Sequence, residues 1–298
     1  MNTCEIKNAN TGGGRCKFDW GQFQRVILTP VGAKFTGLDA SNNPQTIDEW
    51  IMAGIQAAKP EDRFYPMPQF SDNEDNSEDP TEWTDGYGNK FTIRDGAQAF
   101  TQSYLPNYCQ TNRIITFNDG IRRRAIIWDN RNKLWGTTNN GDFQGFECNI
   151  WSLAARPTGA SELSEPKIKY SFVKSDEVGK KFAFDTDLEV VDCEGLEDIE
   201  MVAVKSSTDV LITFKTVCGG QDVTEEMKAM AGVAACWKLD GVNFGTAPTW
   251  DGTNKRFTVA YSVVSTGTTI KIADPSVLAT NNVLLKEVVN SVAVSSLT

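Results

Sequence analysis

Polar and apolar side chains alternate with a period of two residues through most of this chain. The clearest apolar members are Ile168, Tyr170 and Phe172; Val210, Ile212 and Phe214; and Phe257, Val259, Tyr261 and Val263. Successive side chains of a β-strand point to opposite faces, so this pattern predicts strands with one buried face and one solvated face. We therefore expect a mainly β protein.

The middle of the chain carries turn signals between such strands. Asn118-Asp119-Gly120 separates the segments 113–117 and 121–128 and is a good hairpin signal. Two further polar turns are predicted at 129–132 and 139–142. Residues 113–153 are therefore expected to form an antiparallel meander.

Two segments have helical rather than strand periodicity. Thr46 and Glu49 form a capping box, and the predicted helix ends at Lys59-Pro60. Its apolar face comprises Ile47, Trp50, Ile51 and Ile55. The second predicted helix begins near Thr224, with acidic residues in its first turn. Its apolar face comprises Met227, Met230, Ala231 and Ala234.

Composition changes near Cys193. The first 192 residues contain six of the eight Trp, whereas one Arg, Arg256, follows Glu194. A chain of 298 residues commonly forms one large or two ordinary domains. We therefore expect a β-barrel or β-sandwich domain with one flanking helix over 1–193. Over 194–298 we expect an immunoglobulin-like β-sandwich, in architecture only, because the Cys-Trp-Cys signature of antibody domains is missing.

The chain contains no histidine. This excludes Ser-His and Cys-His nucleophile pairs and imidazole zinc sites, although catalysis by carboxylates alone stays open. The seven cysteines include no C-x-x-C pair and are expected to be reduced thiols. We accordingly predict no catalytic, cofactor-binding or metal-binding residue, and therefore not an enzyme.

Acidic residues are concentrated in one segment. Residues 71–88 contain seven Asp or Glu and no Lys or Arg, in a chain of net charge -10. The overall charge argues against broad phosphate binding. We expect a long loop, and Trp83 and Tyr87 favour a protein interface within it. A solvated loop and a Ca²⁺ or Mg²⁺ site stay open, although the spacing does not match an EF-hand.

The only dense basic cluster is Arg122-Arg123-Arg124. On a strand, Arg122 and Arg124 share one face, where they could be solvated, form ion pairs between subunits or contact a polyanion. Together with the acidic segment, this cluster supplies the predicted contacts between subunits. The predicted set is Asp72, Glu74, Asp75, Glu78, Asp79, Trp83, Tyr87, Arg122 and Arg124.

Three segments carry a resemblance to a known class of protein. They are Cys4-Glu5-Ile6-Lys7-Asn8 with Thr11-Gly12-Gly13-Gly14, Leu134-Trp135-Gly136-Thr137, and Gly141-Asp142-Phe143-Gln144-Gly145-Phe146. These segments resemble virion structural proteins of phages and prophages of gut Bacteroidales. The order of elements is similar to that of a phage major tail tube protein, with a β domain, a helix beside it, a long loop and a C-terminal Ig-like domain.

This resemblance implies a ring of subunits that stack into a hollow tube, with the long loop bridging rings. The implied partners are further copies of the chain, other virion proteins, and DNA that passes through the lumen without specific binding. The implied location is the virion, assembled in the host cytoplasm. We expect no membrane contact, because the chain has no run of eighteen apolar residues and residues 1–15 lack the apolar core of a secretory signal.

Three alternatives stay open. The long, Cys-bearing N-terminal segment is compatible with a capsid-decorating or auxiliary virion protein. Exposed Trp and an Ig-like appendage would suit a carbohydrate- or surface-binding module of a gut bacterium. A glycoside hydrolase that uses only carboxylates would need two acids paired in a cleft.

Overall fold

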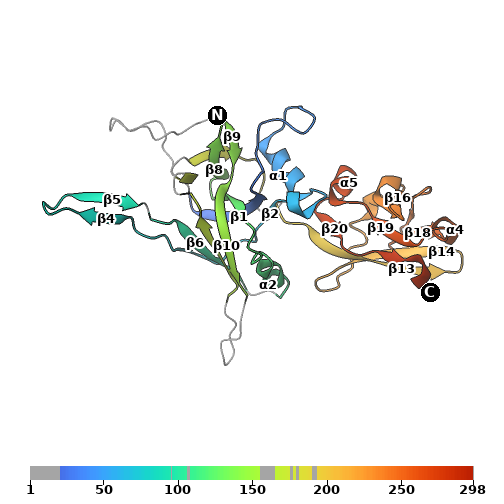
Figure 1. Ribbon diagram of the computed structural model, residues 1–298. Coiled ribbons are helices and arrows are strands. Elements are labelled where there is room, and N and C mark those ends of the chain that lie inside the picture. Colours follow the sequence, from blue (N-terminus) through green and yellow to red (C-terminus); the bar gives the residue numbers. More distant parts are fainter. Residues whose placement is uncertain are drawn as a thin grey trace, which may run out of the picture. The chain divides into compact units, whose positions relative to one another are not determined.

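The computed structural model describes residues 21–94, 96–105, 108–154, 165–174, 177–178, 181–189 and 193–297. The described chain is mainly β, as the alternating pattern predicts (Figure 1). It divides into two compact units. The first comprises Met1–Met52 and Glu61–Glu194, and the second comprises Ala53–Pro60 and Gly195–Thr298. The Cys4–Gly14 segment of the resemblance lies outside the described residues.

The first unit is built on a curled sheet of ten strands. The main path runs β12-β8-β7-β10-β11-β6-β3, while β1 pairs with β2 and β7, and β9 pairs with β8. The strands are β1 Phe23–Pro30, β2 Tyr65–Pro66, β3 Asp72–Asp75, β6 Ala99–Ser103, β7 Arg123–Asp129, β8 Lys133–Asn139, β9 Asp142–Gln144, β10 Phe146–Leu153, β11 Lys167–Phe172 and β12 Lys181–Asp185. The pairings within this sheet are antiparallel.

Alternate residues of these strands supply the core of the first unit. In β11, Ile168, Tyr170 and Phe172 are buried and the residues between them are partly exposed, as predicted. The rings of Tyr170 and Phe100 pack with centroids 4.9 Å apart. Burial of such large apolar side chains is the main favourable contribution to folding of this unit.

The predicted helix near Thr46 is confirmed as α1, Ile47–Ile55, but it ends at Ile55 rather than at Lys59-Pro60. The Thr46 backbone N–H donates to the Glu49 carboxylate (2.8 Å), and the Glu49 N–H donates to the Thr46 hydroxyl (3.2 Å). These are the two bonds of a capping box. Ile47, Ile51 and Ile55 are buried.

The meander is confirmed in part. Turns form at 129–132 and 139–142, where Asn132, Asn140 and Gly141 have positive φ. The strand expected over 113–117 is wrong, because α2, Tyr108–Ile115, occupies it. A short apolar run has no periodicity that separates helix from strand. In this run Ile114 is buried, whereas its neighbour Ile115 is exposed.

The second unit contains two sheets around one core. One sheet has the order β17-β18-β14-β13-β20 and the other β16-β15-β19-β21. The strands are β13 Glu197–Ser206, β14 Asp209–Thr216, β15 Trp237–Leu239, β16 Val242–Asn243, β17 Thr249–Asp251, β18 Arg256–Ala260, β19 Thr269–Ile272, β20 Lys286–Val288 and β21 Val292–Ala293. Both sheets bury side chains in the same core, for example Phe214 and Trp237. This is a sandwich architecture, with β13 and β20 parallel and short helices α4, Tyr261–Val264, and α5, Pro275–Thr280.

Two local predictions in the second unit are wrong. The segment after Thr224 forms turns and a 3₁₀ helix, Lys228–Met230, rather than an α-helix. Its bonds join residues three apart, and Gly232 then takes a φ of 75° that ends the helical run. Met227 and Met230 are nevertheless buried. The strand predicted through Val263 ends at Ala260, after which α4 begins.

The cysteines differ in state. Cys148, Cys193 and Cys236 are free and buried, and burial raises the thiol pKa of Cys148 to about 12 and of Cys193 to about 11. Such thiols are poor nucleophiles at neutral pH. Cys109 and Cys218 are disulfide-bonded, so the expectation of reduced cysteines is wrong for these two. Cys4 and Cys16 lie outside the described residues.

Candidate functional site

The acidic segment is not the single long loop that the sequence predicts. Asp72–Asp75 form β3, which pairs with β6 at one edge of the large sheet. The ladder continues through bonds from Asn76 N to Ala99 O (2.9 Å) and from Glu78 N to Ala97 O (2.8 Å). The chain then forms a separate hairpin of β4, Thr81–Thr84, and β5, Lys90–Arg94. Charged residues are common on edge strands because they discourage unwanted pairing.

The hairpin turn is fixed by one carboxylate. Asp85 accepts hydrogen bonds from the N–H groups of Tyr87 (2.8 Å) and Asn89 (2.9 Å), and from the Asn89 side chain (2.9 Å). The bonds from Asn89 hold the pKa of Asp85 below its usual value. Residues 86–88 form a three-residue turn. Gly88 supplies the positive φ, 83°, that this kind of turn requires.

The two faces of the hairpin differ in polarity. Trp83 lies directly opposite Phe91, and Ile93 follows on the same face. Their exposed fractions are 54%, 53% and 66%, and Tyr87 at the turn is 95% exposed. The opposite face carries Glu82, which pairs with Lys90 at 3.1 Å. The apolar face of Trp83, Phe91 and Ile93 is therefore open to solvent.

Figure 1 shows the hairpin extending away from the sheet of the first unit. A two-stranded hairpin is at best marginally stable in water unless another surface covers its apolar face. Phe91 and Ile93 lie just beyond the acidic segment and were not among the predicted contacts. The alternation of Lys90-Phe91-Thr92-Ile93 after a Gly-containing turn is the sequence signal that identifies them.

The predicted acidic contacts are exposed but do not converge. Asp72, Glu74 and Asp75 lie along β3, and Glu78 and Asp79 lie between β3 and β4. No three His, Cys, Asp or Glu side chains gather as potential metal ligands within the part of the chain that the structure describes. The geometry thus supplies no support for the divalent-cation alternative.

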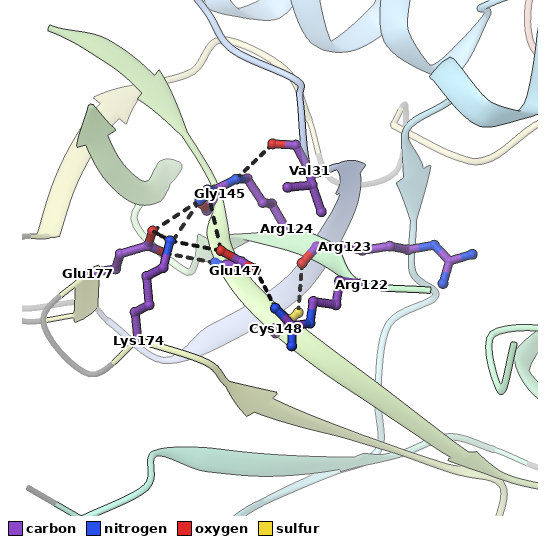
Figure 2. Close-up of polar contacts among 9 residues, drawn as sticks. All are labelled: Val31, Arg122, Arg123, Arg124, Gly145, Glu147, Cys148, Lys174 and Glu177. Carbon is purple, nitrogen blue, oxygen red and sulfur yellow. Dashed lines mark hydrogen bonds and ion pairs between the residues drawn. The ribbon is translucent and has the colours of Figure 1, made fainter. Parts of the chain in front are cut away.

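The arginines form a different kind of cluster (Figure 2). The side chain of Arg124 is only 6% exposed. Its guanidinium donates to the carbonyl oxygens of Val31 (3.0 Å) and Gly145 (2.8 Å) and lies 3.4 Å from Glu177 and 3.8 Å from Glu147. Its partners in the structure are therefore within its own chain, and its role as a contact between subunits stays a prediction. The sequence does not reveal the burial of Arg124, because β7 is buried on both faces and so lacks a solvated face that alternation could identify.

The side chains of the neighbouring arginines are less buried than that of Arg124. Arg122, 57% exposed, pairs with Glu147 at 3.3 Å, and Lys174 reaches the same carboxylate at 2.9 Å. The hydrogen bond from Lys174 holds the pKa of Glu147 below its usual value. Arg123 pairs with Asp119 and lies over the Phe117 ring. The cluster ties β7 and β10 to Glu177 and is a structural element.

A hollow of about 400 Å³ lies beside β3. Its lining residues are Gly21, Gln22, Phe23, Phe70, Ser71, Asp72 and Asn73. Asp72 is the one carboxylate in this lining, whereas a glycoside hydrolase uses two. This hollow therefore offers no acid pair for hydrolysis.

No protein-family model matches the chain, and no curated protein is similar to it. None of the described helices is long and apolar enough to span a membrane. The candidate site is thus defined by its geometry: an amphipathic hairpin with an uncovered apolar face.

Proposed function

We propose that this chain is a self-assembling structural subunit, and that its assembly is the tube of a phage tail. The observation that carries the proposal is the uncovered apolar face of the β4–β5 hairpin, with Trp83, Phe91 and Ile93 more than half exposed. Large exposed apolar patches mark sites of protein association. Trp and Tyr are also enriched among the residues that dominate binding energy.

The free energy gained by burying apolar side chains favours association. Full burial of a large apolar side chain contributes about 1.5–3 kcal/mol, so covering three such side chains can offset part of the cost of docking two copies. The proposal takes the contact to be head-to-tail, with the hairpin of one copy docking on a different surface of the next copy. Head-to-tail contacts generate closed rings or open helical filaments, and stacked rings form a tube.

The edges of the large sheet support the same proposal. β3 ends the sheet on one side and β12 on the other, and β3 is exposed along its length. Edge strands carry backbone groups without partners and are avoided or covered in stable proteins. Pairing between copies would cover such groups, and the acids of β3 would limit that pairing to a partner of complementary charge. The net charge of -10 suits a conduit, since an acidic lumen would not retain DNA.

Negative-stain electron microscopy of the purified chain tests this proposal. The expected result is rings or tubes with a central channel. The companion variant replaces Thr81–Arg94 by a short Gly-Ser linker and keeps β3, which belongs to the sheet. This variant should remain folded by circular dichroism and show single particles. Compact monomers of the unaltered chain at every concentration would contradict the proposal, and assemblies without a channel would contradict the tube.

A further inference from the structure

One face of the large sheet carries charges of opposite sign on two strands that flank β6. Residues directly opposite each other on neighbouring strands share a face. In the order β11, β6 and β3, the two rows on this face are Lys169, Thr101 and Glu74, and then Lys167, Ser103 and Asp72. We call the two lysines on β11 the basic column and the two acids on β3 the acidic column.

Both columns are accessible. Their face points away from the core, because the alternate residues Ile168 and Tyr170 of β11 are buried on the other side. The acidic column is exposed and the basic column is partly exposed. Trp151, which lies opposite Lys169 on β10, is 49% exposed. A partner can therefore reach this face of the sheet.

The two columns do not neutralise each other within one copy. β11 and β3 are two strand spacings apart, about 9–10 Å. Neither column forms an ion pair with any residue in the described ranges. Like charges that lie close together repel each other, so a column of opposite charge would stabilise each of them.

The spacing of the columns makes the face complementary to itself. β11 and β3 lie on either side of β6, each one strand spacing away, about 4.8 Å. A two-fold axis along β6 therefore places the basic column of one copy over the acidic column of another, and the reverse. The rotation keeps the rows, so Lys169 meets Glu74 and Lys167 meets Asp72. Stacked sheets lie about 10 Å apart, a distance that two facing long side chains can span.

We infer that this face of one copy packs against the same face of a second copy, with each column against its opposite. A two-fold contact uses each pairing twice, which gives four ion pairs. Exposed ion pairs contribute about 0–1 kcal/mol each, so free copies meet at this face transiently and sediment as monomers. The contact closes on two copies and does not involve the hairpin, so the inference is independent of the proposed function.

Cross-linking with a carbodiimide tests the inference, because this reagent joins an amine to a touching carboxylate as an amide, with loss of water. The protein is W83A/F91A, which lacks the proposed hairpin contact and whose fold circular dichroism verifies. Equal amounts of ¹⁵N-labelled and unlabelled protein are mixed, and mass spectrometry identifies the linked peptides. A peptide pair that carries one label of each kind comes from two different copies.

We expect mixed-label links from Lys169 to Glu74 and from Lys167 to Asp72. The variant K167E keeps Lys169 and Glu74 but turns two attractive pairs into repulsive ones, so the mixed-label Lys169–Glu74 link should fall about fivefold or more. The matched control, K34E, makes the same change of charge at an exposed lysine outside the face and should leave this link unchanged.

Links that carry a single label, or no links between the columns, would overturn the inference. An equal loss of the mixed-label link in K167E and K34E would also overturn it, because net charge rather than the columns would then govern the encounter. Rings or tubes of the unaltered chain without mixed-label links would leave the proposed function standing while this inference fails. Mixed-label links from a chain that forms no rings or tubes would have the opposite meaning.

Discussion

Trp83 and Phe91 face each other across the β4–β5 hairpin with ring centroids 5.8 Å apart, and both rings are more than half exposed. An aromatic pair of this kind adds about 0.5–1.5 kcal/mol beyond the area that it buries. Here, however, the pair buries little area within its own unit. Its main contribution is therefore expected on contact with another surface.

The first prediction separates folding from association. The double variant W83A/F91A should change the free energy of unfolding of the first unit by no more than about 0.5 kcal/mol for each exposed site. Urea denaturation at a concentration where the chain is monomeric measures this. A loss of several kcal/mol would mean that the hairpin belongs to the core of the unit.

The second prediction concerns α1. Ile51 is fully buried, so Ile51→Ala should cost about 2–5 kcal/mol of stability. Thr46→Ala removes the hydroxyl that caps the Glu49 N–H and should cost about 1 kcal/mol. Urea unfolding of the two variants checks the order. Equal effects would contradict the burial of this helix face.

The third prediction concerns Arg124. Arg124→Met leaves Glu147 and Glu177 without their buried cation and should cost about 3–5 kcal/mol. Arg122→Met is the matched control, because its side chain is 57% exposed and its ion pair should contribute about 0–1 kcal/mol. Comparable unfolding midpoints for the two variants would show that the cluster is not a structural support.

The fourth prediction is a dependence on pH. The hydrogen bond from Lys174 lowers the pKa of Glu147 in the folded chain. A carboxyl group with a lowered folded-state pKa contributes stability that is present above its unfolded pKa, about 4.3, and is lost as the pH falls through the folded value. Stability should therefore decline below about pH 4–5. Urea titrations from pH 7 to pH 3 should show a shallower decline for Glu147→Gln, and an unchanged slope would contradict this assignment.

The fifth prediction concerns the second unit. The described buried residues of its main core cluster run from Ile199 to Leu297, so a fragment of residues 195–298 should fold alone. Cooperative unfolding followed by the fluorescence of the buried Trp237 is the measurement. The structure also assigns Ala53–Pro60 to this unit. A fragment that folds only when this peptide is added would show that the core requires it.

Much of the fold follows from local patterns. The capping box at Thr46 predicts the start of α1, and the alternation around Tyr170 predicts both β11 and its buried face. These signals are local because a helix cap and a half-buried strand each depend on neighbouring residues. The helix over 108–115 could not be predicted in this way, since the packing that buries Ile114 is tertiary.

The candidate site was predictable in part. Acidic residues and Trp83 indicate an interaction segment, but its division into edge strand β3 and a hairpin depends on pairing with β6. Arg124 illustrates a different limit. Its neighbours in the sequence suggest an exposed basic face. The carboxylates that pair with its buried side chain come instead from β10 and from Glu177. The residues next to Arg124 in the sequence give no sign of partners that lie so far along the chain.

Whether the exposed face of the hairpin drives assembly can be measured by sedimentation velocity of the unaltered chain beside W83A/F91A, over a wide range of concentrations. The unaltered chain should sediment as large assemblies whose share grows with concentration. The variant, with the same circular dichroism spectrum, should sediment as a monomer under the same conditions. Identical sedimentation of the two proteins, whether both assemble or both remain monomeric, would contradict the claim that the exposed face of the hairpin drives assembly.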